Sequence, residues 1–223
     1  MELLKVLGID TQKEELYMTA LTHTSYANEH NVISYERLEY LGDAVLELII
    51  SEYLYKTCSK GEGVMTKLRS QYVCENALYE YSLRLKLNDF LLLGHGEAEH
   101  GGKFRKTIVA DIFESFIGAM YLDKGFSYVK KFIFRHIIPI IESGLVDFFD
   151  DYKSMLQEQV QTDKRSLQYI IVSEEGPAHN KVFTIEVRID GIIYGRGTAH
   201  SKKEAEQEAA RDALRKSVTK EQS

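Results

Sequence analysis

Acidic residues recur at helical spacing in the stretch ERLEYLGDAVLELI, residues 36–49. At about 100° per residue these carboxylates fall within an arc of about 80°, opposite an apolar face. Apolar residues also border the arc on both sides, so the acidic stripe is not a simple solvated face. Carboxylates spaced in this way could bind a cation. They are Glu36, Glu39, Asp43 and Glu47.

A second stretch, IVADIFESFIGAMYL at 108–122, has only two charged residues, Asp111 and Glu114. Their i, i+3 spacing places both on one face of a helix. The other residues are apolar or small, apart from Ser115, which predicts a buried helix. An unpaired buried carboxylate is costly, so such groups are paired with cations or bind metal.

Two explanations compete for these carboxylates. The first is salt bridging within the protein, and the candidate partners are Arg37, Lys67, Arg69, Arg105 and Lys106. The second is a hard divalent cation, because Mg²⁺ prefers oxygen ligands and is commonly held through carboxylates. Two helices that each offer spaced carboxylates favour the metal. Gly42 beside Asp43 would admit either a substrate backbone or a closely packed neighbouring helix.

A carboxylate-held Mg²⁺ indicates phosphoryl chemistry. One metal ion can activate a water molecule, and a second can stabilise the leaving oxygen of an in-line displacement. Histidine chemistry is the weaker reading, because a His-based nuclease also needs a second positioned acid or base. We expect a structural role for His23 and surface positions for His95 and His100.

The elements that must position these residues are helical over residues 1–147. Apolar residues recur at helical spacing in 36–56, 66–86, 107–122 and 128–143, and a polar Gly-rich loop is expected at 94–102.

From residue 152 to about 220 the pattern changes to α-β-β-β-α. The stretch KVFTIEVRIDG, 181–191, alternates apolar and polar residues, which predicts a half-buried strand. Asp190-Gly191 predicts a hairpin turn, and Ser201 with Glu204 predicts a capping box that begins a helix. The predicted organisation is a helical domain at 1–147, a short linker at 148–151 and an α+β domain at 152–220.

The final predicted helix places Lys202 and Lys203 in its first turn, where the helix dipole is already positive. Such an N-terminus is a phosphate site if the lysines are not merely solvated. Three alanines at i+4 spacing predict a smooth helix face that lies close on a sheet. They are Ala205, Ala209 and Ala213.

Bulk composition is that of a globular protein: 223 residues, 44% hydrophobic and 28% charged. The net charge of −6 by itself argues against a nucleic-acid partner. The charge is uneven, however. Residues 152–223 hold 12 Lys and Arg against 11 Asp and Glu, a net of +1, and the remaining 16 and 23 give 1–151 a net of −7.

The location expected from the sequence is the cytoplasm. The first ten residues, MELLKVLGID, lack the basic and apolar regions of a signal peptide. No apolar run approaches the roughly 18 residues of a membrane span, so no membrane partner is expected. Cys58 and Cys74 have no metal-ligand spacing and are typical of thiols in a reducing compartment.

The stretch ERLEYLGDAVLEL closely resembles the signature of the ribonuclease III family. ALTHTSYANE (20–29), KGEGVMTKLRS (60–70) and TIVADIFESFIGAMYLDKG (107–125) resemble further blocks of that family, in the same order. The resemblance implies an all-helical endonuclease domain that acts as a homodimer and cuts double-stranded RNA with Mg²⁺, for which Mn²⁺ can substitute. The family often has Gly-Glu-Leu-Thr at the positions where this chain has Gly63-Val64-Met65-Thr66. Val64 thus replaces an acidic residue, a difference that concerns contacts with the substrate.

By position, this resemblance assigns four metal-binding carboxylates, which are Glu39, Asp43, Asp111 and Glu114. Asp43 and Glu114 are those most tied to catalysis. Glu36 and Glu62 match acidic positions that contact substrate, whereas Glu47 has no such assignment.

The second module resembles a double-stranded RNA-binding domain in DYKSMLQEQVQ, GPAHNKVFTIEV and GRGTAHSKKEAEQEAA. Such domains read the shape of A-form RNA over about 16 bp through two minor grooves and the phosphates between them. The resemblance implies RNA contacts from Gln157, Pro177, His179, Lys202 and Lys203.

The leading prediction is a Mg²⁺-dependent endoribonuclease that hydrolyses double-stranded RNA. By resemblance, it leaves 5′-phosphate and 3′-hydroxyl ends and processes structured precursors such as those of ribosomal RNA. One alternative is a non-catalytic protein that binds duplex RNA on the same fold. Another is a metal-dependent phosphohydrolase of small molecules, which leaves the second module unexplained.

Overall fold

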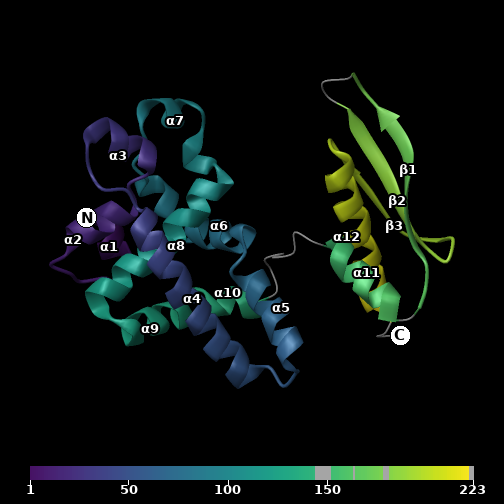
Figure 1. The fold of residues 1–223 in the computed structure, drawn as a ribbon, viewed down its shortest axis with the longest axis horizontal. Helices are drawn as coiled ribbons and strands as arrows, with labels where there is room; N and C mark the ends of the chain where they lie inside the picture. Colours follow the sequence, from purple (N-terminus) through teal and green to yellow (C-terminus); the bar gives the residue numbers. More distant parts are fainter. Residues whose placement is uncertain (144–151, 163, 178–180, 221–223) are drawn as a thin grey trace. The chain divides into compact units, whose positions relative to one another are not determined.

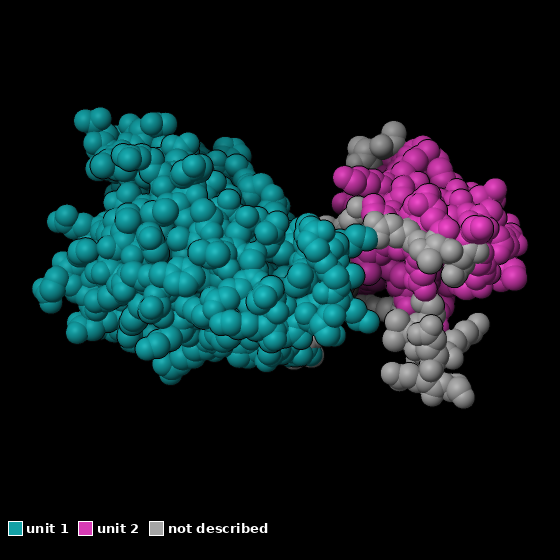
Figure 2. All heavy atoms as spheres, turned by 60° about the horizontal axis from the view of Figure 1, so that its bottom comes forward, with its two compact units in different colours: residues 1–148 teal, residues 149–223 magenta. Residues whose placement is uncertain are grey.

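The computed structural model describes residues 1–143, 152–162, 164–177 and 181–220. The chain divides into two compact units, Met1–Phe148 and Phe149–Ser223 (Figure 2). The predicted linker at 148–151 lies outside the described residues, so the domain boundaries stay a prediction.

The first unit is helical. Its described α-helices and 3₁₀ helices (η) are α1 (Glu2–Val6), α2 (Glu14–Ala20), α3 (Thr24–His30), α4 (Glu36–Thr57), α5 (Glu62–Tyr72), α6 (Glu75–Arg84), η1 (Leu87–Phe90), α7 (His95–Glu99), η2 (Gly102–Phe104), α8 (Lys106–Lys124), α9 (Phe126–His136) and α10 (Ile138–Ser143) (Figure 1).

Helix α8 is the centre of this unit, and α4, α6, α2 and α9 pack around it. Phe113, Phe116 and Ile117 of α8 are fully buried, and the rings of Tyr81 and Tyr17 lie against them from α6 and α2. A helix that is apolar on nearly all sides is expected at such a position, so the burial predicted for 108–122 is confirmed.

Two predicted helices are interrupted. The segment 66–86 is two helices, α5 and α6, because Cys74 has an extended backbone with ψ 159°. The segment 128–143 is also two, α9 and α10, and Pro139 in the second lacks the N–H that a continuous helix would use. The Gly-rich segment 94–102 contains the short helix α7 where the sequence predicted only a loop.

The second unit is α-β-β-β-α, as predicted. Its elements are α11 (Tyr152–Thr162), β1 (Leu167–Glu175), β2 (Val182–Ile189), β3 (Ile192–Ala199) and α12 (Lys202–Lys220). The strands form one antiparallel sheet in the order β1-β2-β3. Asp190 and Gly191 connect β2 to β3 with positive φ values of 51° and 79°, which suits a tight hairpin turn.

The alanine face of α12 packs directly on β3. A Cβ atom at Gly197 would lie 2.3 Å from the carbonyl oxygen of Ala205, and one at Gly195 would lie 2.2 Å from that of Ala209. Ala205, Ala209 and Ala213 are buried. The close helix–sheet contact predicted from the alanine spacing is therefore confirmed.

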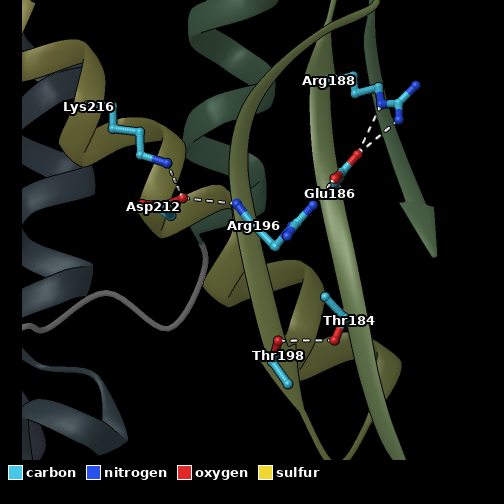
Figure 3. Close-up of polar contacts among 7 residues, drawn as sticks. All are labelled: Thr184, Glu186, Arg188, Arg196, Thr198, Asp212 and Lys216. Atoms are coloured by element: carbon cyan, nitrogen blue, oxygen red, sulfur yellow. Dashed lines mark hydrogen bonds and ion pairs between the residues drawn. The ribbon is translucent and has the colours of Figure 1, made fainter. Parts of the chain in front are cut away.

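Strand β2 alternates as predicted, with Ile185 and Val187 in the core. On its other face Glu186 is only 3% exposed, although the sequence suggested a polar surface position. Arg188 and Arg196 cover its carboxylate at 2.9 and 2.5 Å (Figure 3). Pairing with two guanidinium groups lowers the pKa of Glu186, so the carboxylate stays ionised.

Helix α12 also covers a polar group of the edge strand. The main-chain N–H of Arg196 donates to Oδ2 of Asp212 at 2.9 Å, and Lys216 pairs with the same oxygen (Figure 3). Covering such groups discourages pairing with strands of other chains.

Candidate active site

Helices α4 and α8 touch through their backbones. A Cβ atom at Gly42 would lie 1.7 Å from the carbonyl oxygen of Glu114, and one at Gly118 would lie 2.2 Å from that of Leu38. Only glycine fits at such distances. Of the two roles expected for Gly42, the structure shows close packing of a neighbouring helix.

This contact brings together the four carboxylates of the predicted metal site, which we call the carboxylate cluster: Glu39, Asp43, Asp111 and Glu114. Asp43 is exposed, and the other three are half-buried. The negative charges of Asp43, Glu39 and Asp111 all raise the pKa of Glu114. The four carboxylates, which come from two segments far apart in the sequence, therefore form one electrostatic site.

Burial is the main cause of the altered pKa values in the cluster. It raises the pKa of Glu114 to about 8, with further increases from Asp43, Glu39 and Asp111. Burial, followed by the charges of Asp111, Glu36 and Asp43, raises the pKa of Glu39 to about 7. The ionised form of the cluster is therefore unfavourable without a counter-charge, which a bound cation would supply.

Two of the five basic residues considered as salt-bridge partners, Arg105 and Arg69, contact other groups. Arg105 pairs with Glu97 at 2.6 Å, and Arg69 donates to the hydroxyl of Ser51 at 3.3 Å. Arg105 and Arg69 therefore have partners outside the carboxylate cluster.

Asp111 has a hydrogen-bond donor that the sequence analysis missed. The hydroxyl of Tyr35 donates to Oδ2 of Asp111 at 3.0 Å. Burial raises the pKa of Asp111, whereas this hydrogen bond opposes the increase. The two residues are 76 positions apart, so no local pattern could have paired them.

His23 has the structural role that the sequence predicted. Its side chain accepts from the main-chain N–H of Ser25 and so caps the N-terminus of α3. Its ring also lies against that of Tyr35, with centroids 5.8 Å apart. His95 and His100 are exposed, as expected.

The donor groups of the carboxylate cluster suit a divalent cation. Over the ranges that the structure describes, no three His, Cys, Asp or Glu side chains are already arranged as a metal-binding group. The donors of the carboxylate cluster are all carboxylate oxygens, which Mg²⁺ prefers, and their mutual repulsion is what a cation would relieve. The residues fit Mg²⁺ in their chemistry, and their side chains would have to adjust to bind it.

The two further acidic positions are placed differently. Glu36 is exposed, accepts a hydrogen bond from Ser34 at 2.9 Å and lies near enough to Glu39 to raise its pKa. Glu62 lies on α5, at a hollow of about 560 Å³ between α4 and α5. Glu36 thus borders the carboxylate cluster, and Glu62 belongs to the α4–α5 surface.

The predicted RNA contacts lie in the second unit. Gln157 is exposed on α11, Pro177 is exposed after β1, and Lys203 is exposed in the first turn of α12. His179 lies outside the described residues. The hydroxyl of Ser201 accepts from the N–H of Glu204 at 3.2 Å, the N-cap contact of the predicted capping box.

Lys202 is partly engaged within the protein. It pairs with Glu174 at 3.1 Å and lies over the ring of Phe183 at 5.3 Å. The ion pair of Lys202 with Glu174 of β1 therefore helps to hold α12 against the sheet. The sequence did not indicate this contact.

Two family models match the chain in succession. A Ribonuclease-III-like model matches residues 13–141, and a double-stranded RNA binding motif matches residues 152–217.

Similar proteins span nearly the whole chain. "Ribonuclease 3" of Listeria innocua is 48% identical over 218 residues, 96% of this chain and 95% of that protein. "Ribonuclease 3" of Streptococcus pneumoniae strain P1031 is 47% identical over 216 residues, 95% of this chain and 93% of that protein.

A solved structure of the nuclease domain of ribonuclease III from Campylobacter jejuni is also similar. It is 37% identical with a TM-score of 0.57, and the match covers 61% of this chain and 94% of that one. The family model covers more than half of the chain, and both relatives match nearly all of it at 47–48% identity, so the chain belongs to the ribonuclease III family of endonucleases.

Proposed function

We propose that this protein is a Mg²⁺-dependent endoribonuclease that hydrolyses the phosphodiesters of double-stranded RNA, leaving 5′-phosphate and 3′-hydroxyl ends. The observation that carries the proposal is the carboxylate cluster, half-buried on α4 and α8 of a chain that also has a double-stranded RNA binding motif.

Glu39, Asp43, Asp111 and Glu114 would hold the metal. Bound Mg²⁺ supplies activation of the attacking water and stabilisation of the charge on the leaving oxygen. The close contact of α4 and α8 keeps the carboxylates from the two helices together, and Mn²⁺ would substitute because it takes the same oxygen ligands.

The second unit would bind the duplex by its shape. Gln157 on α11, Pro177 after β1 and the lysines of α12 belong to the three stretches expected to contact RNA. His179, two positions after Pro177 in the sequence, would contribute a further contact. Phosphates would lie at the N-terminus of α12, where main-chain N–H groups and Lys203 favour negative charge. Structured RNA precursors, such as those of ribosomal RNA, are the proposed substrates.

We also propose a homodimer through the nuclease unit. Large apolar side chains are exposed along α4. Leu48 (57% exposed) and Tyr55 (78%) line the α4–α5 hollow, and Tyr40 (83%) lies nearer the start of the helix. Contiguous exposed apolar surface marks interaction sites. The C. jejuni structure bears on the same point, since it is described as flexible in a region involved in dimer formation of that nuclease domain.

The proposed location is the cytoplasm, where thiols such as Cys58 and Cys74 stay reduced. None of the helices in the described part of the chain has the length and apolar character to cross a membrane.

The test is cleavage of a duplex of about 30 bp, long enough for the roughly 16 bp that one binding domain covers. We expect Mg²⁺-dependent cleavage of the duplex but not of its separated strands, and none in EDTA. Glu114→Gln should bind duplex normally and lose at least about 100-fold in cleavage rate, the size of effect for a group acting on the reacting atoms. Glu47→Gln, on the same helix as Glu39, is the matched control.

The same assay separates the alternatives. Tight duplex binding without cleavage under any metal would favour a non-catalytic RNA-binding protein. Cleavage by Glu114→Gln at the wild-type rate would contradict the metal assignment. Hydrolysis of a nucleotide that duplex RNA does not inhibit would favour a small-molecule phosphohydrolase.

Lys203 offers a test of the RNA contacts. Lys203→Ala should weaken duplex binding for all sequences and reduce the salt dependence of binding by about one counterion, because one phosphate contact is lost. Lys216→Ala, which removes a lysine paired with Asp212 on the same helix, is the control. The measurement is fluorescence anisotropy of duplex binding at several salt concentrations. An unchanged slope of log affinity against log salt concentration for Lys203→Ala would place Lys203 outside the interface.

A further inference from the structure

Tyr35 lies directly before α4 and fixes where that helix begins. Its main-chain carbonyl accepts from the N–H of Leu38 at 2.8 Å and from the N–H of Glu39 at 3.0 Å. Its own N–H donates to the carbonyl of Thr22 at 2.9 Å. The backbone of Glu39, a member of the carboxylate cluster, is therefore hydrogen-bonded to the backbone of Tyr35.

The side chain of Tyr35 reaches the other helix of the site. The residue is 3% exposed, and its hydroxyl donates to Oδ2 of Asp111 on α8 at 3.0 Å. His23, held by its bond to Ser25, lies against the Tyr35 ring. One buried residue thus contacts both helices that carry the cluster, by its backbone on α4 and by its hydroxyl on α8.

We infer that Tyr35 is a positioning residue for the divalent cation, acting through Asp111; this inference rests on the proposed function. A carboxylate has two oxygens with about four lone-pair positions, so one hydrogen bond at Oδ2 leaves capacity for a cation. A fixed donor limits the rotation of the carboxylate and so reduces the entropy lost when a metal binds. Such partners of metal ligands commonly affect metal affinity by 10–100-fold.

A purely structural role is the competing account, because Tyr35 is also a core side chain. Tyr35→Phe keeps the ring and removes only the hydroxyl, so it isolates the hydrogen bond. The chain offers a matched control whose acceptor lies on the same helix as Asp111. Tyr17 is fully buried, and its hydroxyl donates to Oδ2 of Asp123, near the C-terminus of α8, at 3.0 Å.

The experiment compares Mn²⁺ binding to full-length wild type, Tyr35→Phe and Tyr17→Phe without RNA, measured from the EPR signal of unbound Mn²⁺. Mn²⁺ is the probe because it takes oxygen ligands as Mg²⁺ does and is directly detectable. We expect about a 10-fold increase in the Mn²⁺ dissociation constant for Tyr35→Phe and less than a twofold change for Tyr17→Phe. The Mg²⁺ concentration for half-maximal duplex cleavage should rise in parallel only for Tyr35→Phe.

Thermal melting in EDTA shows whether each variant is folded. Equal Mn²⁺ affinity for Tyr35→Phe and wild type would overturn the inference, and so would equal weakening in both variants, which would indicate a general loss of stability. Wild type that binds no Mn²⁺ would also overturn it. Failure of the proposed function is distinguishable, since wild type would then leave duplex RNA uncut in Mg²⁺.

Discussion

Two effects raise the pKa of Glu114. Burial removes water from the carboxylate, and the neighbouring carboxylates repel its charge, so the pKa rises from 4.5 to about 8. Glu39 is affected in the same way, with a pKa of about 7. Without a divalent cation, these side chains hold protons near neutral pH that the unfolded chain releases.

This difference predicts that the metal-free protein loses stability as the pH rises. A carboxyl with a raised pKa in the folded state contributes stability that is complete below about pH 4.5 and is lost as the pH rises through about 8. In EDTA at pH 8, Glu114→Gln should therefore be more stable than wild type by at least about 1 kcal/mol, since each pKa unit of the shift corresponds to about 1.4 kcal/mol. At pH 5 the difference should shrink.

Urea unfolding at both pH values measures this change. Glu2→Gln, at an exposed position on α1, is the control and should not alter the pH dependence. A Glu114→Gln variant whose stability falls with pH as steeply as wild type would mean that Glu114 does not hold its proton.

At the scale of elements, the site depends on how closely α4 and α8 approach. Gly42 and Gly118 face the backbone of the opposite helix. The approach lets Asp43 of α4 act on Glu114 of α8. Glycine costs about 1 kcal/mol in a helix relative to alanine, a cost that the contact between the helices offsets.

Gly42→Ala should therefore destabilise the nuclease unit, although alanine is the better helix former. Its Cβ atom would lie 1.7 Å from a main-chain oxygen, and such overpacking costs about 1–3 kcal/mol or more. Gly63→Ala is the control, since nothing lies within 4 Å of a Cβ atom there. Thermal melting followed by circular dichroism should show a lower Tm for Gly42→Ala and an equal or higher Tm for Gly63→Ala; the reverse order would contradict the close packing.

At the scale of the whole molecule, the two units are separately built. Each has its own hydrophobic core, one around α8 and one between the sheet and helices α11 and α12. The acidic charge belongs mostly to 1–151, whereas 152–223 has a net charge of +1. This division resolves the apparent conflict between a net charge of −6 and a nucleic-acid partner, because binding depends on where charge lies.

The proposed homodimer gives a prediction at this scale. Replacing both Leu48 and Tyr55 with Asp would put charge on the exposed apolar surface beside the α4–α5 hollow. Sedimentation velocity should then show the mass of one chain for the variant and of two for wild type. Val6→Asp, at a 74% exposed apolar residue of α1, should stay dimeric. A monomeric wild type, or a variant that still dimerises, would refute this surface as the interface.

The local elements and the residue types of the site can be predicted from the amino-acid sequence. The helical period of 36–56, the apolar composition of 108–122, the hairpin at Asp190-Gly191 and the Ser201 cap are all properties of residues close together in the sequence, which a local pattern records. The sequence also identified the cluster's carboxylates as candidates; their role in metal binding stays a proposal.

Which distant groups meet in space follows from the packing of the folded chain. The bond from Tyr35 to Asp111, the covering of Glu186 by Arg196 and the pairing of Lys202 with Glu174 join segments from 10 to 76 residues apart. Such contacts depend on how whole helices and strands pack, and packing follows from the fit of many side chains together. A side chain's own neighbours in the sequence therefore do not reveal its partner in space.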